Sequence, residues 1–193
     1  DYFCSLETEI DNNELEKNLE YLWSTFMDAK EYGSILEVKE VDFEALKQRL
    51  KEIENEDNLM FGDYRKMLLD KLPMLIKQAE IISRKYEVCV TNPPYMGYSG
   101  LNSKMINYVN VNYSKSKTDL YSMFIEKCLR LTKENKYISM ITMHSWMFIK
   151  SFKEFRNLLL DATLVNMLHL GENAFEELKG EVVKTTSFTI RIK

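Results

Sequence analysis

The residues best suited to chemistry lie in one short stretch, Asn92-Pro93-Pro94-Tyr95, which follows the apolar run 88–90 after a single residue, Thr91. Two consecutive prolines remove two backbone donors and fix φ twice, so neither a strand nor a helix continues through them. The residue before each proline is held in an extended conformation. The sequence therefore predicts a rigid, extended loop with an amide at its start and an aromatic ring at its end.

Such a loop suits the methylation of an exocyclic amine on a nucleobase. The side-chain carbonyl of Asn92 and the backbone carbonyl of Pro93 can both accept hydrogen bonds from the amine, which favours a more pyramidal and more nucleophilic nitrogen. Tyr95 offers a flat face for an extruded base, a contact worth about 1–3 kcal/mol. An ordinary proline-rich turn is the alternative, and the residue order after a β-branched run favours the functional interpretation.

The elements that must position this loop follow from the spacing of apolar residues. It predicts helices over 12–32, 42–55, 62–85, 102–113, 119–133 and 151–160, with Pro73 starting a second helix or a kink. It predicts strands over 34–38, 86–91, 137–143 and 164–170, and a half-exposed last strand over 187–192. This order favours an α/β fold, namely the catalytic half of a doubly wound, Rossmann-like domain over 86–193, preceded by a mostly helical segment over 1–85. The strand over 137–143 is apolar on both faces, as in the middle of a parallel sheet.

Composition limits the possible partners. A hydrophobic content of 45% and an aromatic content of 12% exclude a disordered chain. The net charge of −4 is unusual for a complete DNA-binding protein. Positive charge is local, because the segment from Met96 to Thr118 contains Lys104, Lys115 and Lys117 and no acid. We expect these lysines to touch phosphates, and a solvated surface loop is the alternative.

Cysteine and histidine chemistry is not expected. The three cysteines, at positions 4, 89 and 128, are scattered, and none follows a proline, so the sequence predicts no metal site, no disulfide framework and no cysteine nucleophile. His144 and His169 lack nearby partners in the sequence, so packed or solvent-bonded imidazoles are expected. No apolar run approaches the roughly 20 residues that span a membrane, and we expect a cytoplasmic protein without a membrane partner.

The motif also carries a resemblance. Asn92-Pro93-Pro94-Tyr95, with the surrounding runs 85–97 and 116–126, resembles the AdoMet-dependent adenine-N6 DNA methyltransferases. Within that family it is most similar to the PglX-type enzymes of bacteriophage exclusion (BREX) systems and to methylase subunits of type II restriction enzymes. The resemblance covers about residues 30–193. It implies methyl transfer from S-adenosyl-L-methionine to N6 of a flipped adenine in double-stranded DNA, with other phage-defence or restriction subunits as further partners.

The resemblance also implies roles for individual residues. Asn92 and Pro93 would bind the adenine amine, Tyr95 would stack on the base, and Pro94 would hold the loop. Phe175 would close the other face of the adenine, unless it is a core anchor. Asn92 and Asp119 would lie beside the methyl donor, although a helix cap is the better interpretation of Asp119.

One departure from the family pattern matters for the cofactor. The family binds AdoMet through a glycine-rich turn, and none of the six glycines of this chain forms a Gly-x-Gly pair. With a first residue that is Asp1, we expect an internal fragment that lacks most of the cofactor half and is inactive alone. Methylation of RNA or of a protein glutamine amide, and a non-catalytic binding or scaffold role, remain the alternative functions.

Overall fold

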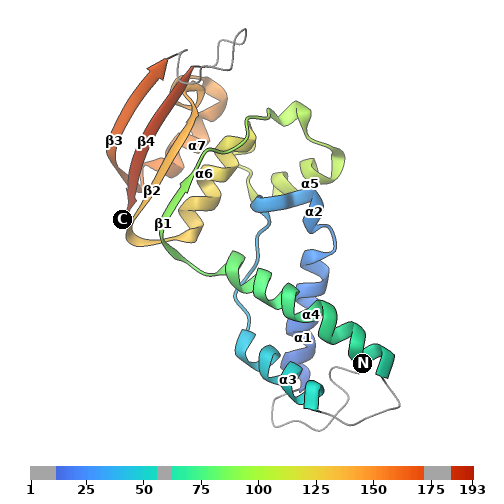
Figure 1. Cartoon of the computed structure of the whole chain (residues 1–193). Coiled ribbons are helices and arrows are strands. Elements are labelled where there is room, and N and C mark those ends of the chain that lie inside the picture. The colour runs from blue at the N-terminus through green and yellow to red at the C-terminus, as the bar shows by residue number, and fades with distance from the viewer. Residues whose placement is uncertain (1–11, 56–61, 172–183) are drawn as a thin grey trace. The chain divides into compact units, whose positions relative to one another are not determined.

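The chain divides after Arg84 into two units, Asp1–Arg84 and Lys85–Lys193. The computed structural model describes residues 12–55, 62–171 and 184–193 (Figure 1). None of the described helices is long and apolar enough to cross a membrane.

The first unit is helical in its described residues. Its helices are α1 (Asn12–Phe26), α2 (Ala29–Tyr32), α3 (Phe43–Asn55) and α4 (Gly62–Ser83), and a 3-10 turn, η1, spans Gly33–Ile35. Apolar residues at helical spacing are buried between the helices, among them Leu22, Leu46, Ile53 and Ile76. These residues give the unit a core of its own.

Three local predictions for this unit need correction. The helix expected over 12–32 is interrupted between α1 and α2. The strand expected over 34–38 is wrong, because η1 and an irregular segment occupy it. Ile35 and Leu36 are adjacent and both buried, which a strand with one covered face does not permit. Pro73 lies within the single helix α4, so the expectation that it starts a second helix is wrong, whereas a kink at this residue stays a prediction.

The second unit is built around a four-stranded sheet. Its elements are β1 (Tyr86–Thr91), η3 (Tyr98–Gly100), α5 (Ser103–Asn112), α6 (Leu120–Leu131), β2 (Thr132–Met143), η4 (Ser145–Met147), η5 (Lys150–Phe152), α7 (Lys153–Leu159), β3 (Ala162–Gly171) and β4 (Thr185–Ile192). The strand order is β1-β2-β4-β3. The pairing of β1 with β2 is parallel, and β4 runs antiparallel to both β2 and β3. The predicted α/β class is confirmed, but β2 has one parallel and one antiparallel neighbour rather than two parallel ones.

Helices cover one face of this sheet in the described residues (Figure 1). Tyr121 and Ile125 of α6 and Phe155 of α7 pack against Met140 and Phe188 of the strands. This burial follows the predicted alternation of the last strand, in which Phe188 and Ile190 point inward.

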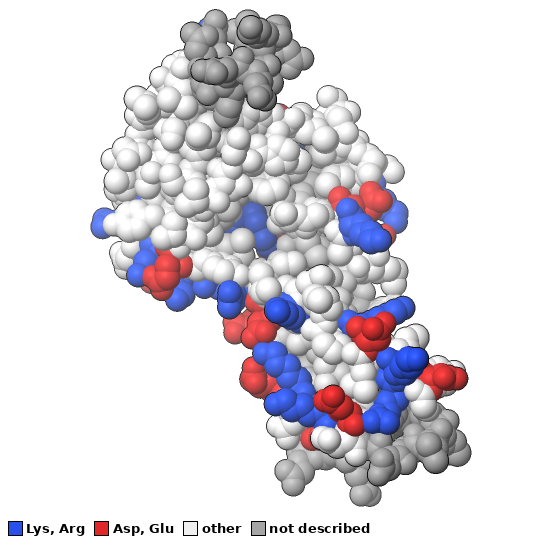
Figure 2. Space-filling view, in the orientation of Figure 1, with Lys and Arg blue, Asp and Glu red and all other residues white. Residues whose placement is uncertain are grey.

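The opposite face of the sheet is open. Val88 and Val90 of β1 are 55% and 73% exposed, and Leu168 of β3 is 62% exposed. The pairing register places all three side chains on the face that Ile141 shares. Figure 2 shows few charged side chains over these strands, whereas charges of both signs gather over the helices of the first unit.

A bulge shapes the start of β2. Tyr86 pairs with Thr132 and Val88 pairs with Tyr137, so the four residues 133–136 of β2 lie opposite the single residue Glu87, three more than a regular ladder has. Asn135 within them has a φ of 61°, in the left-handed region that asparagine tolerates. Lys133 and Lys136 from both sides of the bulge form ion pairs with Glu87. β2 therefore begins at Thr132, five residues before the strand expected over 137–143.

The topology brings three strand ends together. Because β2 and β3 both run antiparallel to β4, they are parallel to each other, and β1 is parallel to β2. The carboxyl ends of β1, β2 and β3 therefore lie at the same edge of the sheet, the edge where open α/β sheets bind their ligands.

Candidate active site

The segment after β1 is irregular from Asn92 to Met96, as two prolines require. Asn92 is exposed, Pro93 is buried, Pro94 is exposed and Tyr95 is half-buried. The loop is thus anchored through the Pro93 ring, while the Asn92 amide and part of the Tyr95 ring remain accessible.

The amide and the ring lie next to each other. The Tyr95 hydroxyl donates a hydrogen bond of 3.3 Å to the Asn92 side-chain carbonyl oxygen. Burial raises the pKa of Tyr95, and the nearby Asp119 carboxylate adds to the effect, so this phenol stays protonated and able to donate. A protonated Tyr95 hydroxyl therefore donates the hydrogen bond that links this ring to the Asn92 side chain.

The far side of the loop is fixed to the start of α6. The Met96 N–H donates to Asp119 Oδ1 over 3.1 Å, and the Leu120 N–H donates to the Met96 carbonyl over 2.8 Å. The Tyr98 N–H adds a bond of 3.1 Å to the Thr118 carbonyl. These contacts tie the Asn92–Met96 loop to a segment twenty or more residues away in the sequence.

Asp119 is the cap of α6, which confirms that part of the prediction. Its Oδ1 also accepts the Tyr121 N–H over 3.2 Å, and the Ser122 hydroxyl completes a capping box. Burial raises the pKa of Asp119, although hydrogen bonds from the Tyr121 and Met96 amides act in the opposite direction. The carboxylate thus holds both the helix and the loop.

The three expected phosphate-binding lysines fall in different settings. Lys117 donates to Asn110 Oδ1 over 2.7 Å and lies 5.9 Å from the centroid of the Tyr98 ring, a cation–π arrangement. Lys104 is exposed on α5, and Lys115 is exposed in the turn that follows this helix. The structure therefore brings Lys117 close to the motif through Tyr98, and contact with phosphate remains a prediction.

The two histidines form a pair that sequence reasoning missed. His144 Nδ1 and His169 Nε2 lie 2.8 Å apart, and the His144 ring packs edge-on against Phe148. Burial first, and then His169, lower the pKa of His144, so the neutral ring is favoured. Only the sheet topology could have indicated this pair, because His144 follows β2, His169 lies near the end of β3, and these two strands are parallel.

The structure describes the residues expected beside AdoMet but not the residue expected on the second face of the adenine. Phe175, expected to close the other face of the base, lies outside the described residues. The two groups expected beside AdoMet are the exposed Asn92 amide and the Asp119 carboxylate, whose Oδ1 already serves two backbone amides. The residues of this chain thus fit the methyl-accepting side of such a site, and no Gly-x-Gly pair is present for the donor side. In the described residues, no group of three or more His, Cys, Asp or Glu side chains could hold a metal ion.

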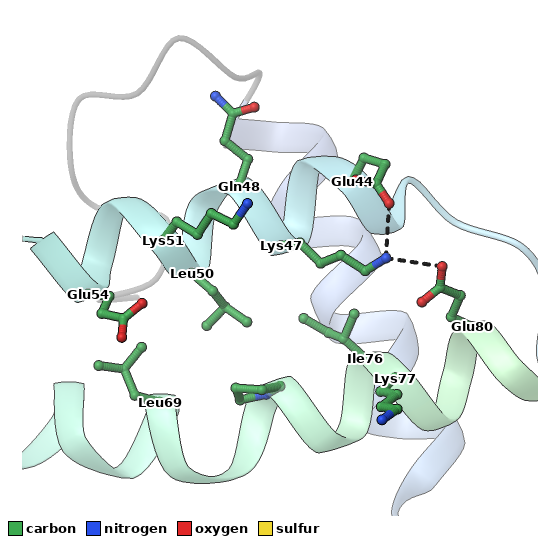
Figure 3. A pocket seen from close by; sticks show the side chains of 11 residues that line it. Glu44, Lys47, Gln48, Leu50, Lys51, Glu54, Leu69, Ile76, Lys77 and Glu80 are labelled. Atoms are coloured by element: carbon green, nitrogen blue, oxygen red, sulfur yellow. Dashed lines mark hydrogen bonds and ion pairs between the residues drawn. The ribbon is translucent and has the colours of Figure 1, made fainter.

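A cavity of about 760 Å³ lies elsewhere, between α3 and α4 of the first unit (Figure 3). Lys47 at its wall donates to Glu44 over 2.9 Å and to Glu80 over 3.0 Å, and these hydrogen bonds raise the pKa of Lys47. Its lining balances three lysines, at 47, 51 and 77, against three glutamates, at 44, 54 and 80. The cavity contains none of the expected site residues and offers no net charge to an anion.

The known proteins that this chain resembles are named as methylases or methyltransferases, as the Asn-Pro-Pro-Tyr motif predicts. The family described as Eco57I restriction-modification methylase matches residues 4–175. The chain is 44% identical over 121 residues to adenine-specific methyltransferase PglX of Lacticaseibacillus casei (strain Zhang), covering 63% of this chain and 10% of that protein. It is 37% identical over 170 residues to adenine-specific methyltransferase BrxX of Escherichia coli O9:H4 (strain HS), covering 86% of this chain and 14% of that protein. The chain therefore spans about a tenth to a seventh of the length of these relatives.

Proposed function

This chain belongs to the Eco57I restriction-modification methylase family, and we propose that residues 92–95 form the base-binding part of a DNA adenine-N6 methyltransferase. The observation that carries the proposal is the convergence of the exposed Asn92 carbonyl and the half-buried Tyr95 ring on one loop. This loop leaves the carboxyl edge of the sheet, and Asp119 holds its far side.

Each residue of the loop has one task in this proposal. The Asn92 and Pro93 carbonyls accept hydrogen bonds from the adenine amine and direct its lone pair away from the ring plane. Tyr95 stacks on the base after it leaves the duplex. Bound AdoMet supplies the methyl group as an electrophilic sulfonium carbon. Pro94 limits the motion of the loop, because its ring fixes φ.

Double-stranded DNA is the proposed substrate in restriction or phage defence, with partner subunits of such a system and a cytoplasmic location. The names of both relatives specify adenine, and the acid-free segment from Met96 to Thr118 follows the loop directly. An RNA base or a protein glutamine amide would need the same carbonyl acceptors, so the assay must include these substrates.

The test replaces Asn92 by Ala in the complete protein that contains these residues. We expect methyl transfer to an adenine-containing duplex to fall by about 100-fold or more, the usual scale for losing one group that stabilises a transition state. AdoMet affinity, measured by calorimetry, should remain close to that of the wild type. Transfer to duplex DNA, RNA and a release-factor peptide is compared in parallel.

The control replaces Asn166, an exposed asparagine of β3, by Ala, and this change should leave transfer intact. Full activity of Asn92→Ala would refute the assignment. Preferential methylation of the peptide or of RNA would keep the loop chemistry and overturn the substrate.

A further inference from the structure

Tyr121 is a fully buried aromatic residue that contacts the stacking ring. Its centroid lies 5.9 Å from that of Tyr95 with an interplanar angle of 86°, a T-shaped arrangement. Such pairs are attractive beyond simple burial and constrain the relative orientation of the two rings. The half-buried Tyr95 ring thus rests on a side chain that cannot itself move into solvent.

The Tyr121 ring is fixed from two other directions. It stacks on Phe152, with centroids 5.8 Å apart and an interplanar angle of 25°. Its hydroxyl lies 2.8 Å from the Ser145 hydroxyl, which follows the end of β2. Burial strongly raises the pKa of Tyr121, so its hydroxyl remains protonated in this contact.

The backbone around the two rings is held by one carboxylate oxygen. Asp119 Oδ1 accepts the N–H of Tyr121 and the N–H of Met96, the residue directly after Tyr95. The backbone segments that carry the Tyr121 and Tyr95 side chains are therefore held by the same oxygen atom. A change at Tyr121 must then reach Tyr95 through the ring contact rather than through a loss of the loop anchor.

We propose that Tyr121, locked by the Ser145 hydroxyl, is a positioning residue that sets the orientation of the Tyr95 ring for stacking on the target base. The inference rests on the proposed function for its meaning, because a stacking ring contributes most when its plane is fixed before the base arrives. Tyr121 itself touches no substrate in this arrangement.

The first measurement needs no activity and uses the 193-residue chain. Fluorine NMR of chains grown with 3-fluorotyrosine gives one signal per tyrosine, and Tyr95→Phe identifies the Tyr95 signal. In Tyr121→Leu this signal should shift and broaden, because the ring loses its support. Tyr121→Phe and Ser145→Ala should each cause a smaller shift, and the double variant should not add to it, because both changes remove the same hydrogen bond.

The second measurement reads the consequence for a base. Binding of a single-stranded oligonucleotide with one 2-aminopurine is followed by fluorescence quenching. Tyr121→Leu should weaken binding by about two- to tenfold, the range that corresponds to one aromatic pair. The matched control, Phe155→Leu, removes another fully buried ring of the same core that contacts Trp146 and Phe152. It should lower the melting temperature without changing the Tyr95 signal or the affinity.

The outcomes separate this inference from the proposed function. An unchanged Tyr95 signal in Tyr121→Leu and Tyr121→Phe overturns the positioning role. An equal change in Phe155→Leu also overturns it, because any loss of core packing would then have the same effect. If the wild type itself fails to quench 2-aminopurine, the base-stacking function fails, while the NMR series still decides whether Tyr121 orients Tyr95.

Discussion

At the scale of single residues, the candidate site depends on groups that serve structure and chemistry together. Asp119 is the clearest case, because one carboxylate oxygen caps α6 and holds the Asn92–Met96 loop through Met96. Sequence reasoning found this residue by its position before a helical pattern and by family resemblance. Its contact with Met96 joins positions 23 residues apart, which no local pattern specifies.

Asp119 should make stability depend on pH in an unusual direction. Burial raises its pKa in the folded chain, so the stability that the protonated carboxyl contributes is present below the unfolded pKa of about 3.9. It is lost as pH rises through the higher folded pKa. Asp119→Asn keeps an oxygen acceptor without the charge, so its stability relative to the wild type should increase as pH rises from about 4.

Urea unfolding of both proteins between pH 3.5 and 7 measures this difference. A variant that becomes relatively less stable with rising pH would mean that the charged carboxylate is favoured by its hydrogen bonds more than it is penalised by burial.

At the scale of elements, the parallel pair β1–β2 decides where the loop begins. Its register contains the bulge opposite Glu87, whose carboxylate pairs with Lys133 and Lys136. These two hydrogen bonds lower the pKa of Glu87 to about 2. The ion pairs lie at the surface, so they mainly select the register rather than supply much stability.

Replacement of Glu87 by Gln tests that contact. Because the folded pKa is depressed, the contribution of Glu87 is present above its ordinary value of 4.5 and is lost as pH falls toward 2. The wild type should be slightly more stable than Glu87→Gln near neutral pH, and the difference should vanish in acid and shrink in high salt. Thermal melts across pH and salt provide the measurement.

Glu134→Gln, a change in an exposed acid of the same bulge, is the matched control. A pH-independent deficit of Glu87→Gln would assign its effect to packing instead of charge.

The elements also show which parts of the fold can be predicted from sequence. The strands at 86–91 and 187–192 were found because apolar runs and alternation are local signals. The strand expected over 34–38 was wrong because the same apolar residues pack between helices when no strand is available for pairing in the described part of their unit. The antiparallel neighbour of β2 was missed because strand order depends on contacts between distant residues.

The same limit applies to the site. The motif itself was readable, because two prolines dictate local backbone shape. The His144–His169 pair was not, since 25 residues separate its members and only the sheet brings them together. The contact of Tyr121 with Tyr95 also escapes prediction, because it depends on how the loop folds back toward α6.

At the scale of the whole molecule, the open face of the sheet gives the second unit an exposed apolar surface. It exposes apolar side chains on β1, which is also the edge of the described sheet. An exposed, apolar edge strand offers unpaired backbone groups and invites association. We therefore expect the 193-residue chain to self-associate at high concentration.

Val90→Lys should reduce this association, because it places a charge on the most exposed position of the edge strand. Sedimentation velocity over a concentration series measures the change. The free energy of unfolding should stay within about 0.5 kcal/mol of the wild type, as for most surface substitutions.

Val111 of α5 offers the matched control, because it is 82% exposed and does not belong to the sheet. If Val111→Lys reduces association as much as Val90→Lys, added net charge rather than the strand edge is responsible.

The hydroxyl of Tyr95 already occupies the Asn92 oxygen, and under the proposed function this makes base entry an exchange of partners. An arriving amine replaces a phenol, so the number of hydrogen bonds at Asn92 need not rise, and ring stacking supplies most of the net gain. A purine without an N6 hydrogen, such as 2-aminopurine, would still stack on Tyr95 but would return no hydrogen bond to the Asn92 oxygen. The resting loop would thereby bind a base that carries an N6 hydrogen more tightly than a fully substituted one, and the phenol would bond to the Asn92 carbonyl again when the product leaves.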